Sequence, residues 1–190
     1  MPILPALMAV LLLSGSAAQT SAPASVPAAP VLPTHIVAMT AYNAVPEQTD
    51  GDPMVTASGA YSNPEIVAAR SRDLKEELPF GTIIEIDGPT DKQHGCGYDV
   101  VSPIMGYRVI ADTMHQRFTD RVDVLFSTRA NYIMSNGSEI NASHILGVCE
   151  GVTIRVVGHL DPTKMGSLPE TQAELAAIVR GGGNALALNR

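Results

Sequence analysis

The sequence has no tryptophan, only two cysteines in 190 residues, and an aromatic content of 4%. So few cysteines exclude a disulfide-dense scaffold, and 16 glycines are too few for a collagen-like chain. No run of Lys or Arg occurs, and acidic side chains outnumber basic ones by 19 to 12. Nucleic-acid surfaces and polybasic membrane patches need clustered cations, which argues against both functions. The histidines and cysteines lack zinc-ligand spacing, and we predict neither a metal nor another cofactor.

The first 33 residues contain no charged side chain. The apolar run 3–13, followed by small residues at 16–18, has the pattern of a signal peptide, predicted at 1–18. The run is shorter than the ~20 residues of a membrane-spanning helix, and no Lys or Arg precedes it, so an uncleaved N-terminal anchor is the alternative. Residues 19–33, rich in Ala, Pro and Ser, are expected to form an extended linker. We therefore expect an exported protein of the periplasm, outer membrane or cell envelope, with no membrane span in the mature chain.

The two cysteines, Cys96 and Cys149, agree with export. An even number of cysteines in an oxidising compartment favours one disulfide. A bridge closing a loop of this length would stabilise the fold by roughly 3–4 kcal/mol. Two buried free thiols are the alternative.

Residues 34–160 are predicted to form one domain of short strands separated by turns. Strands rich in apolar and β-branched residues are expected at 35–42, 65–70, 81–86, 107–111, 121–126 and 151–157. One helix is expected at 127–136, with Ser127 as its N-cap and Asn136-Gly137 as its stop. A second helix is expected at 169–180 in a C-terminal tail that spans 161–190. Several short strands with few helices favour a small closed barrel, so the predicted fold class is mainly β.

The segment 109–126 carries the most informative acidic residues. An apolar strand ends in Asp112, and a second strand carries Asp123 in its interior, where Asp is disfavoured. Strict alternation assigns one set of side chains in that strand to the core, Val122, Val124 and Phe126, and the other to the opposite face, Arg121, Asp123 and Leu125.

That opposite face is either a ligand groove or a solvent-exposed surface with an Arg121–Asp123 ion pair. A strand-turn-strand would bring Asp112 close to the start of the returning strand. Two carboxylates beside one cleft are the arrangement that cuts a glycosidic bond.

Four motifs occur in order along the domain. They are Met39-Thr-Ala-Tyr42 with Glu47-Gln-Thr-Asp50, Val55-Thr-Ala-Ser-Gly59, Arg72-Asp-Leu74 with Leu78-Pro-Phe-Gly-Thr82, and Ala111-Asp-Thr-Met114 with Arg117-Phe118 and Arg121-Val-Asp-Val124. Through these four motifs, the chain resembles the 3D (Asp-Asp-Asp) domain family over residues 36–157. The resemblance implies a six-stranded double-psi β-barrel related to the A-type lytic transglycosylases and expansins, which act on β-1,4-linked glycans, mostly peptidoglycan.

The resemblance also assigns roles to the acidic residues. Asp123 falls on the family's catalytic acid, and Asp112 on the Asp that ends the preceding strand. The third family Asp normally lies in an Asp-Pro; Asp73 is the nearest here, without the Pro. The usual Gly-Gly after the Asp-Thr is replaced by Met114-His115, and residues 87–106 look like an insertion.

Hydroxyls, a glycine and two cations near these acids are the expected substrate contacts: Thr40, Tyr42, Thr56, Ser58, Gly59, Arg117 and Arg121. Ordinary strand and turn usage is the alternative for Thr56 and Ser58. We expect the two arginines to face sugar or peptide carboxylates rather than Asp123, and we expect Phe118 in the core.

The expected function is lytic transglycosylation of peptidoglycan or a related β-1,4 glycan. Asp123, kept protonated by Asp112 and a partly apolar pocket, would act first as acid and then as base. The alternatives are a non-catalytic glycan-binding or expansin-like wall-loosening module, and plain hydrolysis with a separately placed base. The sequence does not indicate an oligomeric state.

Overall fold

The computed structural model describes residues 32–49 and 51–182, and within them the chain is mainly β. The predicted signal peptide, and the predicted linker up to residue 31, lie outside the described residues. The strands are β1 (Thr34–Asn43), β2 (Val67–Arg70), β3 (Thr82–Asp87), β4 (Arg108–Thr113), β5 (Arg121–Phe126), β6 (Asn131–Ile133), β7 (Glu139–Asn141) and β8 (Cys149–His159). The α-helices are α1 (Tyr98–Val101), α2 (Ala142–Leu146) and α3 (Gln172–Arg180), and the 3-10 helices are η1 (Arg72–Lys75), η2 (Ser102–Ile104) and η3 (Pro162–Ser167).

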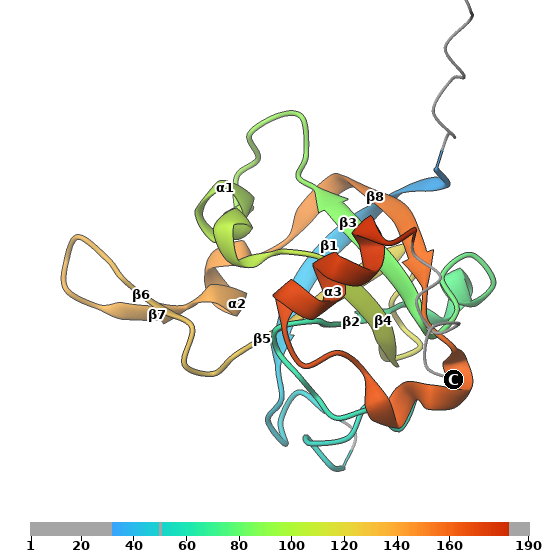
Figure 1. Ribbon diagram of the computed structural model, residues 1–190. Helices are drawn as coiled ribbons and strands as arrows, with labels where there is room; N and C mark the ends of the chain where they lie inside the picture. The colour runs from blue at the N-terminus through green and yellow to red at the C-terminus, as the bar shows by residue number, and fades with distance from the viewer. Residues whose placement is uncertain (1–31, 50, 183–190) are drawn as a thin grey trace, which may run out of the picture. The chain divides into compact units, whose positions relative to one another are not determined.

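Six of the strands close into a barrel in the order β1-β5-β2-β4-β3-β8, with β8 pairing again with β1 (Figure 1). The β1–β5 and β2–β4 pairs are parallel and the other four pairs are antiparallel. This mixed barrel confirms the predicted fold class and is compatible with a double-psi barrel. Each of the six predicted strands is present, with its ends shifted by at most two residues.

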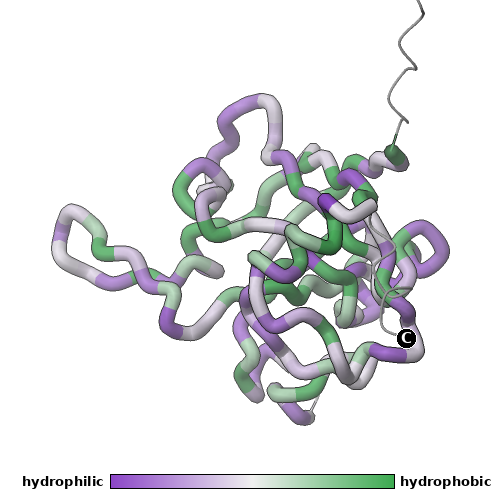
Figure 2. Tube along the Cα trace, in the orientation of Figure 1, coloured by the Kyte–Doolittle hydropathy of each residue, from purple (hydrophilic) through white to green (hydrophobic). Residues whose placement is uncertain are grey.

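Apolar side chains from all six strands fill the interior of the barrel. Val122, Val124 and Phe126 of β5 are at most 2% exposed and belong to this interior cluster, as their alternation predicts. Figure 2 shows the apolar segments concentrated in the barrel and hydrophilic residues in the connecting loops. Leu125, expected on the face of Arg121 and Asp123, is fully buried as well, because a second cluster covers part of that face.

The second cluster attaches the C-terminal helix α3 to the barrel. Leu175 of α3 and Met165 of η3 pack with strand residues such as Val67 and Val109. The helix begins at a capping box, in which Thr171 accepts from the Glu174 amide and the Glu174 carboxylate accepts from the Thr171 amide. The predicted helix at 169–180 is therefore present, beginning three residues later than expected.

The helix predicted at 127–136 is wrong. Residues of this segment form β6, which pairs with β7 in a hairpin that extends away from the barrel (Figure 1). The Asn-Gly pair at 136–137, taken as a helix stop, is the hairpin turn: Gly137 has φ +81°, and the Met134 amide donates to the Ser138 carbonyl. The Ser127 hydroxyl accepts from the Arg129 amide and starts a turn instead of a helix.

The disulfide between Cys96 and Cys149 is present, with the two Cα atoms 4.8 Å apart. It joins the segment 87–106 to the first residue of β8. A β-bridge between Cys96 and Gly147 lies beside it. The predicted pairing is confirmed, and free thiols are excluded for both residues.

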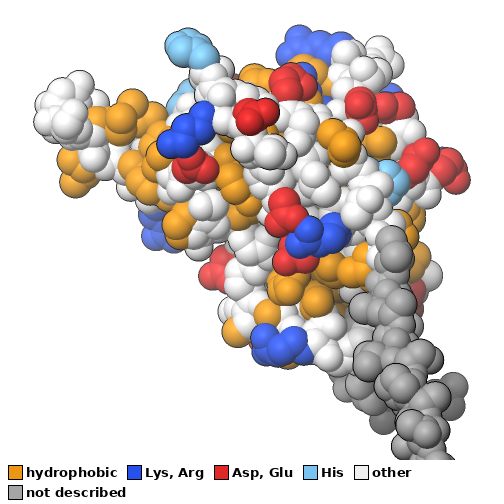
Figure 3. All heavy atoms as spheres, turned by 90° about the horizontal axis from the view of Figure 1, so that it is seen from above, with side chains coloured by type: hydrophobic (Ala, Val, Ile, Leu, Met, Phe, Trp, Pro, Cys, Tyr) orange, Lys and Arg blue, Asp and Glu red, His pale blue; other side chains and the backbone are white. Residues whose placement is uncertain are grey.

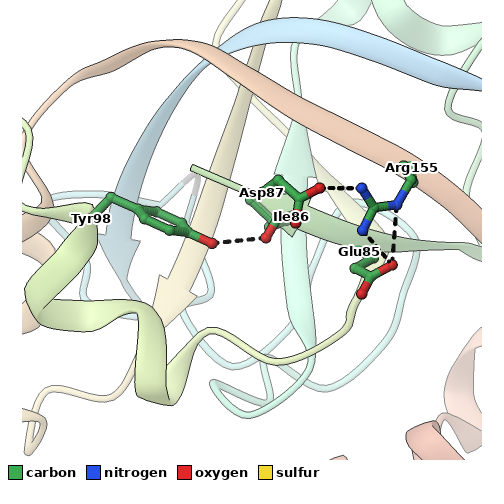
Figure 4. Close-up of polar contacts among 5 residues, drawn as sticks. All are labelled: Glu85, Ile86, Asp87, Tyr98 and Arg155. Atoms are coloured by element: carbon green, nitrogen blue, oxygen red, sulfur yellow. Dashed lines mark hydrogen bonds and ion pairs between the residues drawn. The ribbon is translucent and has the colours of Figure 1, made fainter. Parts of the chain in front are cut away.

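A polar contact holds α1 against β3, and ion pairs join β3 to β8 (Figure 4). Tyr98 of α1 donates its hydroxyl to the Ile86 carbonyl at 2.8 Å. On the neighbouring strands, Arg155 forms ion pairs with Glu85 and Asp87. On the face seen in Figure 3, acidic and basic side chains are likewise interspersed instead of forming a patch of one sign. None of the helices in the described part of the chain is long and apolar enough to cross a bilayer.

Candidate active site

A cleft with a volume of about 610 Å³ lies over the neighbouring strands β1, β5, β2 and β4. The loop that follows β1 and the loop that follows β4 form its walls. The lining side chains are Ala41, Tyr42, Glu47, Gln48, Thr49, Val55, Thr56, Ala57, Ser62, Ala69, Arg72, Asp112, Thr113, Met114, His115, Arg117, Phe118 and Asp123. Both predicted acids, Asp112 and Asp123, open into this one cleft.

Strand register places four residues in one row across the cleft floor. Asp123 pairs with Thr40 of β1 on one side and with Ala69 of β2 on the other, and Ala69 pairs in turn with Asp112 of β4. Adjacent strands lie about 4.8 Å apart, so the Cα atoms of the two acids are about 10 Å apart. The side chain between them is only the methyl group of Ala69, which lines the cleft and is 3% exposed. The expected strand-turn-strand of β4 and β5 is present, but the two strands do not pair with each other, because β2 lies between them.

Asp112 reaches this row through a β-bulge. Ala68 pairs with Ile110, but Ala69 pairs with Asp112, so two residues of β4 face one of β2. Ile110 belongs to the interior cluster, and strict alternation would send Asp112 to the same side. The extra residue, Ala111, reverses that direction, and its carbonyl accepts from the Ser58 amide at 3.1 Å.

Asp123 is a partly buried acid held by one side-chain donor. The Thr40 hydroxyl donates to its Oδ1 at 2.8 Å. Burial raises the pKa of Asp123 from 3.8 to about 6, assisted by the charge of Asp112 and opposed by the Thr40 hydrogen bond and the charge of Arg121. At pH 7 a pKa of 6 keeps about a tenth of the molecules protonated, on the order of a hundredfold more than at 3.8. The Arg121–Asp123 ion pair, one of the two alternatives for this face, is not among the salt bridges of the described residues.

Asp112 is fixed by three donors. Its Oδ2 accepts from the Tyr42 hydroxyl at 2.8 Å, and its Oδ1 accepts from the amides of Ala57 and Thr113 at 2.9 and 2.8 Å. Burial and the neighbouring carboxylate of Asp112 raise the pKa of Tyr42 well above its usual value, so Tyr42 stays a neutral donor. The second acid is therefore held rigidly, whereas the first has a raised pKa and a single side-chain donor.

The turn at 56–60 builds the wall beside Asp112. Thr56 is buried, its hydroxyl lies 3.0 Å from that of Ser58, and it accepts from the Ala60 amide at 3.2 Å. Gly59 has φ +82°, a conformation that glycine adopts without strain. Of the predicted contact residues in this turn, Thr56 lines the cleft, while Ser58 and Gly59 support the turn without lining it.

Of the two predicted cations, Arg117 lines the cleft and Arg121 does not. Phe118, predicted in the core, is half-buried: its ring packs against the second cluster and also lines the cleft. Thr40, the remaining predicted contact, does not line the cleft and reaches it through its bond to Asp123.

Asp73, the predicted third family acid, does not line the cleft. Its Oδ2 accepts from the Asp120 amide at 2.7 Å. Burial alone would raise the pKa of Asp73, but hydrogen bonds from the Ser71 hydroxyl and from backbone amides lower it. The residue therefore anchors the start of β5 and holds no proton for chemistry in the cleft.

Several lining residues were not predicted as site residues. Glu47, Gln48, Thr49 and Arg72 lie within the motifs that carry the family resemblance, so that signal was available. Ala69 and Ser62 lie in no such motif, and only the strand pairing and the loop path bring them to the cleft.

The arrangement suits general acid chemistry on a polar substrate. A carboxyl group with a raised pKa and an oriented carboxylate flank an open floor lined with hydroxyl, amide and cationic side chains. Among residues 32–49 and 51–182, no group of three or more His, Cys, Asp or Glu side chains is placed to hold a metal ion. Comparison of the sequence with known family models gives no match, and comparison with curated proteins gives none either.

Proposed function

We propose that the protein is a 3D-domain, double-psi-barrel enzyme that cleaves β-1,4 glycosidic bonds of peptidoglycan by lytic transglycosylation. The observation that carries the proposal is the presence of Asp123 and Asp112 in one cleft, with the pKa of Asp123 raised to about 6. The order of the four motifs and the closed six-stranded barrel support the family assignment.

One acid is enough for this reaction because the nucleophile is part of the substrate. Protonated Asp123 donates its proton to the glycosidic oxygen as the bond from that oxygen to C1 breaks. The C6 hydroxyl of the muramic sugar that carries this C1 atom then attacks C1 and gives its proton to the Asp123 carboxylate. The products are a 1,6-anhydro sugar and a chain end with a free 4-hydroxyl, and Asp123 is protonated again.

Asp112 is assigned the electrostatic role. Its negative charge, fixed by three donors, stabilises the positive charge that develops on the sugar ring in the transition state. It also favours the protonated form of Asp123 before reaction. Ala69 lines the cleft between the two acids, so no bulky side chain separates them where the sugar ring would bind.

A glycan-binding or expansin-like module is the second candidate, and the placement of Asp73 favours it. Only two of the three family acids line the cleft, because the carboxylate of Asp73 binds the Asp120 amide. Such a module would use the same cleft to hold the glycan without breaking it.

The proposed location is the cell envelope, reached by export. The Cys96–Cys149 disulfide is consistent with an oxidising compartment. Peptidoglycan is accessible there, whereas the reducing cytosol disfavours such a bond.

The test is mass spectrometry of purified peptidoglycan after digestion with the wild type, with Asp123→Asn and with Asp91→Asn. Asp91 is an exposed carboxylate outside the cleft, so its variant is matched in charge. We expect 1,6-anhydro products from the wild type and the control, and a rate at least about 100-fold lower from Asp123→Asn. Reducing-end products would identify a hydrolase. No product from the wild type, with sedimentation on peptidoglycan intact, would identify the binding module.

A further inference from the structure

Three arginines lie in or beside the cleft. Arg72 of η1 and Arg117 line it. Arg121 of β5 does not line it, but two hydrogen bonds join its backbone to Ser71, the residue before Arg72. Within the described ranges, the cations that form ion pairs within 4 Å are Arg155 and Lys92, and none of these three does. Unpaired cations clustered at a cleft stand out in a chain with a net charge of −7.

The ring of Phe118 holds two of these cations in place. The guanidinium carbons of Arg117 and Arg121 lie 4.7 and 5.3 Å from the ring centroid, both within cation–π distance. Since Phe118 packs against the second cluster, its ring is a fixed platform. Stacking of this kind reduces the freedom that two long side chains would lose on binding a ligand.

Arg121 also has an unused donor. Its Nε is shielded from solvent and has no hydrogen-bond acceptor among the described residues, the only buried side-chain nitrogen or oxygen there without a partner. A buried donor without an acceptor is costly. The planar arginine fork matches a carboxylate, which accepts two parallel hydrogen bonds.

The cationic end is close to the reacting acid. Arg121 precedes Asp123 by two residues on the same side of β5, so their Cα atoms are about 7 Å apart. A single bound glycan can therefore place its scissile oxygen at Asp123 and a substituent at the arginines. An anion bound there would also offset the Arg121 charge that lowers the pKa of Asp123.

We propose that Arg72 and Arg117, with Arg121 stacked beside Arg117 on Phe118, form a subsite for a carboxylate carried by the glycan beside the bond at Asp123. This inference rests on the proposed function for the identity of the glycan. It restricts the substrate to chains with acidic substituents, and neutral β-1,4 glycans of the same backbone become poor ligands. Two carboxylates could fill the subsite, the lactyl group of a bare muramic sugar or the acidic groups of an attached peptide.

The test compares the binding of three tetrasaccharides to the full-length Asp123→Asn protein by calorimetry. The probes are chitotetraose, the N-acetylglucosamine–N-acetylmuramic acid tetrasaccharide without peptide, and the same tetrasaccharide with peptide stems. We expect at least one acidic probe to bind about tenfold or more tightly than chitotetraose. If the saccharide without peptide binds most tightly, the bound group is the lactyl carboxylate. If the peptide-bearing saccharide binds most tightly, the bound group is a peptide carboxylate.

Substitutions then assign the preference to the cationic end. Adding Arg117→Gln should abolish most of the tenfold preference without weakening chitotetraose binding, and Arg117→Lys should restore only part of it. Arg129→Gln, an exposed arginine that does not line the cleft, is the control and should leave the preference unchanged. Arg117 is exposed, so its loss should not unfold the protein, and circular dichroism checks this.

The two proposals fail in different ways. Equal binding of neutral and acidic probes, or a preference that survives Arg117→Gln, overturns the carboxylate subsite even if the wild type cleaves peptidoglycan. Acid-selective binding by a wild type that releases no product overturns the proposed activity and leaves the subsite standing.

Discussion

Replacing Asp123 with Asn should stabilise the fold at neutral and alkaline pH. Burial raises the pKa of Asp123 from 3.8 to about 6, so the folded chain holds this proton more tightly than the unfolded chain. Stability is therefore lost as pH rises between these two values, and the loss is complete above pH 6 to 7. With 1.36 kcal/mol for each pKa unit, the ionised side chain costs about 3 kcal/mol at pH 8. Asn keeps the shape and accepts the Thr40 hydrogen bond without the charge.

Urea unfolding at pH 8 and pH 4 measures this difference directly. We expect Asp123→Asn to exceed the wild type by about 3 kcal/mol in free energy of unfolding at pH 8, and by less than about 1 kcal/mol at pH 4. Asp91→Asn removes an exposed carboxylate of equal charge and should match the wild type at both pH values. A stability gain that is independent of pH, or a loss at pH 8, would refute the raised pKa and with it the acid role of Asp123.

Three further changes test other parts of the structure. Ala69→Leu fills the floor between the two acids and should abolish product formation in the peptidoglycan digest, while overpacking costs only about 1–3 kcal/mol; full activity would contradict the placement of the substrate. Reduction of the Cys96–Cys149 bridge should lower the free energy of unfolding by roughly 3–4 kcal/mol, measured with urea, and an unchanged midpoint would argue against the bridge. Leu175→Ala should cost about 2–5 kcal/mol by thermal unfolding, and a negligible change would mean that α3 does not pack on the barrel.

The barrel strands were predictable because their signal is local. Runs of β-branched residues bounded by turns mark each of the six strands, and alternation in β5 identifies its interior side chains. The segment 127–136 failed because a serine followed by Asn-Gly fits a helix cap and stop as well as a hairpin. Only the pairing of β6 with β7 separates the two readings.

The candidate site was predictable in its residues but not in its assembly. The motifs single out Asp112 and Asp123, yet no local pattern reveals that β2 lies between their strands or that a bulge turns Asp112 toward the cleft. Ala69 gives no signal in the sequence, since a small apolar residue in a strand is ordinary. Pairings between distant segments determine these features, and alternation within one strand carries no information on them.

The row Thr40–Asp123–Ala69–Asp112 draws one residue from each of four strands, and the Thr40–Asp123 bond spans 83 positions of the chain. No short segment of the polypeptide holds this row, and pairings between such distant segments form slowly. On the proposed function, the catalytic row therefore forms only when β1, β5, β2 and β4 have paired. An unfolded precursor then cannot cleave glycan, and no separate inhibitor is needed to prevent it.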